Sequence, residues 1–293
     1  HVWHIPWPAM EVYRILPWSR ELLQGMLACQ VVGFHVEEYV ENFLESARYL
    51  LGARIEGNRV LWEGREVRVE AHPLGVDIAH FEQMAQSEAV QQKAQQLREE
   101  IGTEWLMLGV DRLDYTKGIR ARLLAFERFL EMYPEYHGRV SFYQVATPSR
   151  TQVTSYQQLK REVDEVVGRI NGQFGRVDWT PVHYRYRTYT QEELCVFYRA
   201  ADVACITPLR DGMNLVAQEF LSELTGASHV LREAVLVNPY DVDGLASAMR
   251  MALEMPIEER MERFRCLKRS VQALDVHRWA ARFFETFTAM AQG

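Results

Sequence analysis

The fold is decided by the stretch Thr207-Pro208-Leu209-Arg210-Asp211-Gly212-Met213-Asn214-Leu215-Val216-Ala217-Gln218-Glu219. It follows the apolar run 202–206, which is typical of a buried parallel strand, and it leads into a helix. Ligands of open α/β sheets bind beyond the carboxyl ends of the strands, where N–H groups of a helix start are available. The pattern therefore predicts a ligand site in which Asp211 and Glu219 accept hydrogen bonds from hydroxyl groups. An aspartate cap followed by a glycine turn is the alternative interpretation.

A second strand-to-helix turn carries two cations. Residues 104–110 predict a buried strand, and residues 119–133 predict the helix after it. Between them, Arg112 and Lys117 place positive charge beside a helix N-terminus, which opposes the helix dipole. This cost is explained if an anion binds between the two cations, and a diphosphate fits best. The alternative is an exposed network of aspartate, arginine and lysine side chains.

Predicted strands and helices alternate along the chain from residue 101. The strands are 104–110, 140–146, 180–184 and 202–206, with a last strand and loop at 235–241. The helices are 119–133, 151–170, 191–200, 213 onward, 242–254, 257–272 and 277–290. This alternation predicts a parallel sheet with helices on both faces. Before residue 101, the pattern predicts helices at 21–29, 37–51 and 79–100 and short strands at 53–56, 59–62 and 66–71.

Composition narrows the class of protein. The 293 residues, 48% of them hydrophobic, can form two domains. The net charge of -7 argues against a nucleic-acid-binding surface, and no apolar run is long enough to span a membrane. Asp241-Val242-Asp243 is interpreted as a helix cap, so we expect no metal site. The cysteines lack paired spacing and indicate reduced thiols in a cytoplasmic protein; they are Cys29, Cys195, Cys205 and Cys266.

Several literal motifs resemble one family. They are His4-Ile5-Pro6-Trp7-Pro8, Gly109-Val110-Asp111-Arg112-Leu113-Asp114-Tyr115-Thr116-Lys117-Gly118, Pro148-Ser149-Arg150, Gly168-Arg169-Ile170-Asn171-Gly172 and the 209–217 part of the opening stretch. In this order they resemble glycosyltransferase family 20, the trehalose-6-phosphate synthases. The resemblance covers nearly the whole chain. It implies an α/β protein of the GT-B fold, in which two Rossmann-like domains face a cleft.

The resemblance also implies domain bounds. Residues 1–98 would be the C-terminal part of the N-terminal, acceptor-side domain, which is then incomplete in this chain. Residues 99–276 would be the nucleotide-sugar-binding domain, and 277–293 a helix that crosses back to the first domain. The chain departs from the family pattern after Phe220, where it is shorter. We expect a segment missing from the sequence in hand, and a natural deletion is the alternative.

The resemblance assigns roles to individual residues. Arg112 and Lys117 would stabilise the departing diphosphate in place of a metal ion, and Asp211 and His4 would contact the donor sugar. Arg150 would bind the phosphate of the acceptor, for which a planar guanidinium is suited. The full set expected to bind the donor is Arg112, Lys117, Asp211, Gly212, Met213, Asn214, Leu215 and Glu219.

The implied activity is that of a retaining glucosyltransferase. It would move glucose from a nucleotide-diphosphate glucose to glucose 6-phosphate and give trehalose 6-phosphate, without a cofactor, a nucleic acid or a membrane. Three alternatives share the motifs: a glucosylglycerol-phosphate synthase that uses glycerol 3-phosphate, a cyclitol-coupling pseudo-glycosyltransferase, and a catalytically silent sensor of sugar phosphates. The donor base and the oligomeric state stay open, with a homo-oligomer among the alternatives.

Overall fold

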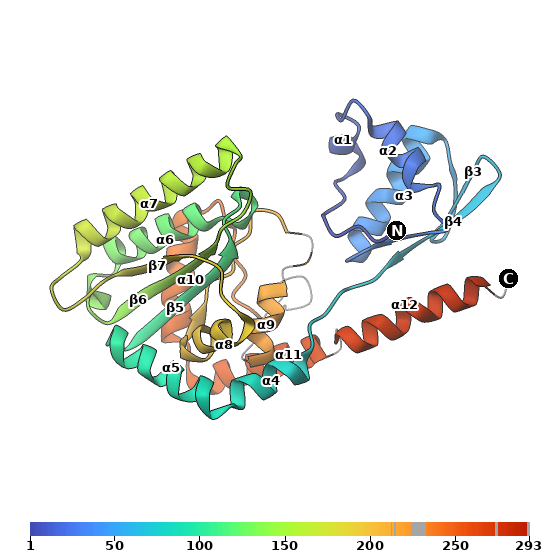
Figure 1. Cartoon of the computed structure of the whole chain (residues 1–293). Helices are drawn as coiled ribbons and strands as arrows, with labels where there is room; N and C mark the ends of the chain where they lie inside the picture. Colours follow the sequence, from blue (N-terminus) through green and yellow to red (C-terminus); the bar gives the residue numbers. More distant parts are fainter. Residues whose placement is uncertain (212, 214, 224–232, 273–274, 292–293) are drawn as a thin grey trace. The chain divides into compact units, whose positions relative to one another are not determined.

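The computed structural model describes residues 1–211, 213, 215–223, 233–272 and 275–291 (Figure 1). It forms two compact units. The first unit consists of His1–Gly75, Asp211–Met213 and Leu274–Gly293, and the second of Val76–Arg210 and Asn214–Ala273. The packing thus divides the chain after Gly75, whereas the resemblance placed the division near residue 98.

The first unit is built on a mixed sheet of four strands. The strand order is β1(Val31–Phe34), β4(Arg65–Ala71), β3(Arg59–Trp62) and β2(Arg54–Glu56), with β1 parallel to β4 and the other pairs antiparallel. The helices are α1(Met10–Tyr13), α2(Ser19–Met26), α3(Glu37–Leu51) and α12(Val276–Ala291). A cluster of aromatic side chains lies at the centre of its core, where the ring centroid of Trp7 is 5.0 Å from that of Phe43 and 5.8 Å from that of Phe34. On α12, Trp279 donates a hydrogen bond of 3.2 Å to the carbonyl oxygen of His72.

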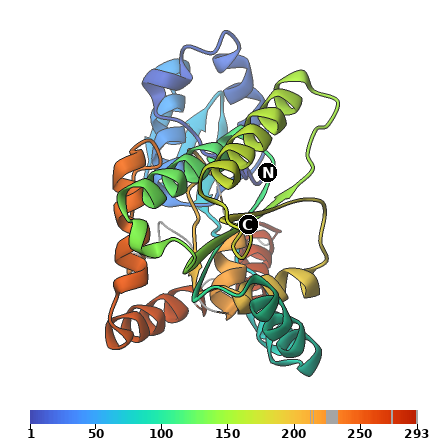
Figure 2. The same cartoon turned by 90° about the vertical axis from the view of Figure 1, so that its left-hand side faces the viewer.

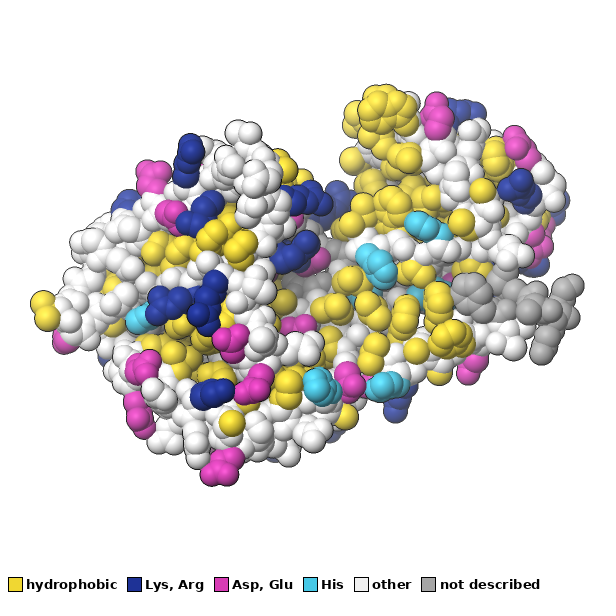
Figure 3. Space-filling model, in the orientation of Figure 1, with side chains coloured by type: hydrophobic (Ala, Val, Ile, Leu, Met, Phe, Trp, Pro, Cys, Tyr) yellow, Lys and Arg dark blue, Asp and Glu magenta, His cyan; other side chains and the backbone are white. Residues whose placement is uncertain are grey.

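Apolar side chains gather on the outer surface of the first unit. Figure 3 shows them over α1 and α2. Trp18 is 64% exposed and Ile15 is 76% exposed, and Val12 and Leu22 are exposed as well. Exposed apolar patches of this kind mark surfaces that contact another part of a protein or a partner.

The second unit is a three-layer α/β/α structure (Figures 1 and 2). Its parallel sheet has the order β7(Val182–Tyr186), β6(Val140–Thr147), β5(Trp105–Arg112) and β8(Val203–Ala204). One face is covered by α6(Ile119–Met132), α7(Thr154–Phe174) and α10(Val242–Glu254). The other is covered by α4(Ile78–Gln86), α5(Glu88–Ile101), α8(Gln191–Ala200), α9(Leu215–Glu223) and α11(Ile257–Gln272). Two short 3-10 helices, η1(Tyr115–Lys117) and η2(Pro134–Tyr136), flank α6.

The side chains of β5 show how both faces become buried. Leu106, Leu108 and Val110 pack with α4, α5 and α8, whereas Met107 packs with α6 and α10. Because alternate residues of a strand point to opposite faces, a strand between two helical layers must be apolar throughout. This explains the continuous apolar run that predicted the strand.

Three sequence predictions need correction. The helix predicted at 79–100 is two helices, because Ser87 is extended and its Oγ accepts a hydrogen bond from Val90 N at 3.3 Å, which starts α5. The strand within the predicted strand and loop at 235–241 is wrong, since residues 235–238 have no regular structure and 239–240 form a turn, with Asp241 N donating to Asn238 O at 3.0 Å. β8 is shorter than the predicted 202–206, since only Val203 and Ala204 pair with β5; before them, the Asp202 backbone N donates to Leu106 O at 2.9 Å and its carboxylate accepts from Leu106 N at 2.7 Å.

No described helix combines the length and the apolar character that crossing a membrane requires.

Candidate active site

The turn after β5 carries the two cations that the sequence singled out. Arg112 is the last residue of β5 and is exposed, while Lys117 ends η1 and is half-buried. Asp114 caps η1, because its Oδ1 accepts hydrogen bonds from the backbone N of Thr116 at 3.0 Å and from its Oγ1 at 2.9 Å. Arg112 forms no ion pair with a residue that the structure describes. Its charge acts on the nearby Asp114 carboxylate without a direct ion pair between them.

The loop after β8, where residues 207–219 begin, is hydrogen-bonded to the turn after β5. The backbone N–H groups of Leu209 and Arg210 both donate to the carbonyl oxygen of Thr116, at 2.8 and 3.3 Å. The two strand-to-helix turns predicted from the sequence are thus joined through the backbone up to Arg210, and Asp211 follows directly in the chain.

Gly118 allows the loop after β8 to approach the turn after β5 closely. Its φ of 66° lies in the left-handed region that favours glycine, and a Cβ at this position would overlap the carbonyl oxygen of Thr207. No other residue type fits without a shift of the backbone.

Beneath the turns lies a buried arginine that the sequence analysis did not identify as functional. The Arg122 side chain is fully buried and donates to Asp111 Oδ2 at 2.7 Å, to Thr207 Oγ1 at 2.9 Å and to the carbonyl oxygen of Lys117 at 3.3 Å. Gln144 Oε1 accepts a further bond at 3.2 Å. Since the network touches both turns, it fixes their spacing from below.

The spacing of residues along α6 could have identified Arg122 as buried. Ile119, Arg122 and Phe126 follow one another at spacings of three and four residues and are all buried. A charged residue on the apolar face of a helix must be paired, so its partner belongs to the same site. Gly109 leaves room for the pair, because a Cβ there would lie 2.5 Å from Arg122 Nη1.

Arg150 is connected to the first turn through a tyrosine. It follows β6, and its Nη1 donates to Tyr156 Oη at 3.1 Å. Tyr156 Oη in turn donates to Asp114 Oδ2 at 3.0 Å. Burial by itself would raise the pKa of Asp114, but the hydrogen bonds from Thr116 and Tyr156 and the charge of Arg112 outweigh it and lower the pKa. Asp114 is therefore ionised at neutral pH. Through Tyr156 it connects Arg150, which follows β6, with the turn after β5 that carries Arg112.

Glu219 lies in α9 and is half-buried. Tyr198, which is 1% exposed, donates a hydrogen bond of 2.8 Å to Glu219 Oε2. Burial raises the pKa of Glu219, and the bond from Tyr198 opposes this only in part. The structure thus holds one carboxylate oxygen in place.

Of the remaining predicted residues, His4, Asp211 and Met213 belong to the first unit and Leu215 to the second, and two lie outside the described part. His4 Nδ1 is 3.1 Å from the sulfur of Met213, and Tyr39 Oη donates to the carbonyl oxygen of Asp211 at 3.4 Å. Leu215 is the first residue of α9. Gly212 and Asn214 lie outside the described residues.

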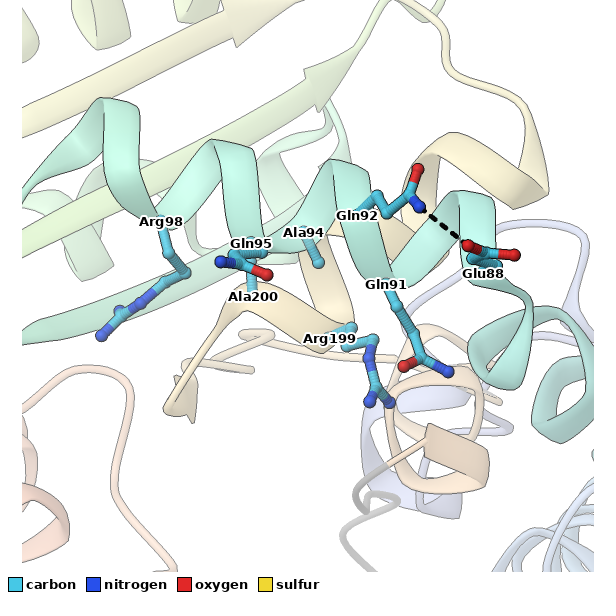
Figure 4. A pocket seen from close by; sticks show the side chains of 8 residues that line it. All are labelled: Glu88, Gln91, Gln92, Ala94, Gln95, Arg98, Arg199 and Ala200. Carbon is cyan, nitrogen blue, oxygen red and sulfur yellow. Dashed lines mark hydrogen bonds between the residues drawn. The ribbon is translucent and has the colours of Figure 1, made fainter.

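A separate cavity lies between α5 and α8. Figure 4 shows the residues that line its volume of about 410 Å³, which are Glu88, Gln91, Gln92, Ala94, Gln95, Arg98, Arg199 and Ala200. Arg98 is already bound to Asp202 at 2.8 Å and to the carbonyl oxygen of Glu104 at 2.7 Å. None of the predicted site residues lines this cavity. Among the described residues, no three His, Cys, Asp or Glu side chains gather in a way that could hold a metal ion.

Comparison with known proteins places this geometry in a family. The family model of glycosyltransferase family 20 matches residues 1–289. A bifunctional trehalose-6-phosphate synthase/phosphatase of Thermoproteus tenax is 44% identical over 294 residues, which cover 96% of this chain and 40% of that protein. The chain therefore spans less than half the length of that relative.

Solved structures agree with the sequence match. An alpha,alpha-trehalose-phosphate synthase (UDP-forming) from Burkholderia vietnamiensis superposes with a TM-score of 0.94 and 34% identity, over 99% of this chain and 69% of that one. A synthase of the same type from Burkholderia xenovorans, in complex with glucose-6-phosphate, gives a TM-score of 0.92 and 33% identity, over 98% of this chain and 67% of that one. The α/β GT-B fold predicted from the sequence is confirmed, and the chain belongs to glycosyltransferase family 20.

Proposed function

We propose that the protein transfers glucose, with retention, from UDP-glucose to glucose 6-phosphate and so makes trehalose 6-phosphate. The observation that carries the proposal is the joined pair of turns, which presents Arg112 and Lys117 at the start of α6. A nucleotide diphosphate gains negative charge as it leaves the sugar. Two fixed cations and the N–H groups of a helix start stabilise that charge more in the transition state than in the ground state.

The other predicted residues complete the donor and acceptor sites in this proposal. Glu219 accepts hydrogen bonds from the ribose hydroxyls, and Asp211 and His4 contact the donor sugar. The backbone near Met213 and Leu215 holds sugar hydroxyls or phosphate oxygens. Arg150 binds the acceptor's phosphate. The leaving phosphate oxygen helps to deprotonate the acceptor hydroxyl, and no metal ion or other cofactor takes part.

The family membership supports the choice of substrates. A relative of the chain is named as UDP-forming, and a solved relative holds glucose-6-phosphate. A silent sensor is disfavoured because it would not need two cations at the donor turn, one of which lacks an ion-pair partner among the described residues. Glycerol 3-phosphate carries the same phosphate group as glucose 6-phosphate, so Arg150 does not separate these two acceptors.

Product identification tests the proposal. The full-length protein is incubated with UDP-, ADP- or GDP-glucose and with glucose 6-phosphate or glycerol 3-phosphate, with and without a chelator. We expect trehalose 6-phosphate from UDP-glucose and glucose 6-phosphate at a rate that the chelator does not change. Product from glycerol 3-phosphate alone would identify the alternative synthase, and ligand binding without turnover with any pair would identify a sensor.

A further inference from the structure

Three side chains from separate elements form a continuous hydrogen-bonded chain. Arg150 follows β6, Tyr156 lies in the first turn of α7, and Asp114 lies in the turn after β5. The two distances are 3.1 Å from Arg150 Nη1 to Tyr156 Oη and 3.0 Å from Tyr156 Oη to Asp114 Oδ2. Tyr156 is only 4% exposed and Asp114 only 8%. The hydroxyl of Tyr156 therefore joins the donor-side turn, at the buried Asp114, to the exposed Arg150.

The direction of both hydrogen bonds is fixed by chemistry. A guanidinium only donates, so the Tyr156 oxygen must accept from Arg150. An ionised carboxylate only accepts, so the Tyr156 proton must point to Asp114. The Tyr156 hydroxyl thus accepts one hydrogen bond and donates another, and a phenylalanine at this position could form neither bond.

Arg150 needs such support because its backbone is strained. Its φ of 46° lies in the left-handed region, which is uncommon for residues other than glycine. The guanidinium carbon lies 5.5 Å from the centre of the Tyr156 ring, so the ring supports the cation as well as the hydroxyl does. One of the five N–H donors of Arg150 is bound to Tyr156, which leaves the others to bind a phosphate.

We propose that Tyr156 is a positioning residue, whose hydroxyl holds Arg150 ready for the phosphate of the acceptor and ties it to the turn that carries Arg112 and Lys117. The inference rests on the proposed function, because it takes Arg150 as the acceptor's phosphate ligand. Tyr156 does not touch the substrate itself. It acts through Arg150, so its removal affects acceptor binding more than donor binding.

The test is Tyr156→Phe in the full-length protein, with UDP-glucose and glucose 6-phosphate as substrates. We expect the acceptor KM to rise about three- to tenfold, the range of one net hydrogen bond. We expect kcat and the calorimetric affinity for UDP to stay within about twofold of wild type, a factor that corresponds to less than one weak hydrogen bond. Thermal unfolding checks that the variant is folded.

Tyr136→Phe is the matched control. Tyr136 is 6% exposed and donates a hydrogen bond of 3.1 Å to the carboxylate of Glu254, in the same unit but among other residues. The Tyr136→Phe variant loses a hydrogen bond between a tyrosine and a carboxylate, as Tyr156→Phe does. An equal rise of the acceptor KM in both variants would show a general effect of lost packing and would overturn the inference.

A double-mutant cycle separates the inference from the proposed function. Arg150→Ala should raise the acceptor KM about tenfold to a hundredfold, as the loss of a charge-assisted phosphate contact does. In that background Tyr156→Phe should change the KM no further, because it has no arginine left to position. An undiminished effect of Tyr156→Phe in the double mutant, or none in the single mutant, overturns the role of Tyr156 alone. An unchanged acceptor KM in Arg150→Ala overturns the proposed role of Arg150 and the inference with it.

Discussion

Gly118 packs against the carbonyl oxygen of Thr207 so closely that no side chain fits between them. This contact joins the turn after β5 to the loop after β8, and both loops carry residues that the proposed function uses. The spacing of the two loops is thus set by the backbone contact of a glycine and by the hydrogen bonds of Arg122.

Gly118→Ala is predicted to destabilise the second unit and to reduce turnover. The left-handed backbone alone costs a residue with a Cβ about 1–2 kcal/mol, and the overlap with Thr207 adds to this. Gly102→Ala is the control, since Gly102 has a φ of 68° but a Cβ added there would lie 3.8 Å from the nearest contact, the carbonyl oxygen of Glu99. Urea unfolding should show a larger loss for Gly118→Ala, and only this variant should lose activity. Equal losses of stability with full activity in both would contradict the spacing argument.

Arg122→Met is predicted to cost about 3–5 kcal/mol of unfolding free energy, because it breaks the buried ion pair of 2.7 Å between Arg122 and Asp111. The double variant Arg122→Met, Asp111→Asn should recover part of the lost unfolding free energy, since the buried negative charge is then removed as well. Chemical denaturation of the two variants measures this difference. If the single and the double variant are equally unstable, the loss comes from packing and not from the broken ion pair.

The sequence predicted the parts of the fold that follow from local patterns. The bounds of α8 and α10 agree with the predicted 191–200 and 242–254, because Thr190 and Asp241 cap their N-termini and an apolar period marks the length of each helix. β1 was not predicted, since Val31–Phe34 has only four residues and contains a glycine. Its pairing with β4 is a long-range contact that no local pattern contains.

The same distinction holds for the candidate site. Arg112, Lys117 and Arg150 could be proposed from the sequence because each lies at or after the end of a strand, where ligands of α/β sheets bind. The hydrogen bonds of Arg122 and Tyr156 could not be predicted, because their partners Thr207 and Asp114 are distant in sequence and come close only in the folded chain.

The raised pKa of Glu219 predicts a pH dependence of stability. Because the folded state binds this proton more tightly than the unfolded state, Glu219 stabilises the fold at low pH. That contribution is complete below the ordinary pKa of 4.5 and is lost as the pH rises through the folded value. The unfolding free energy of wild type relative to Glu219→Gln should therefore decrease as the pH is raised from 4. Glu165→Gln, which removes an exposed carboxylate of α7, is the control, and a difference that increases with pH would show that the pKa is lowered instead.

The central claim is that Arg112 and Lys117 stabilise the charge of the departing diphosphate. Single-turnover rates of Arg112→Ala and Lys117→Ala, measured in the full-length protein with UDP-glucose and glucose 6-phosphate, test it most directly. Loss of one fixed stabiliser of developing charge costs about 3 kcal/mol, so each variant should be slower by two or more orders of magnitude. Arg128→Ala, on the exposed side of α6, should keep the wild-type rate. Near-normal rates in both Arg112→Ala and Lys117→Ala would contradict the account.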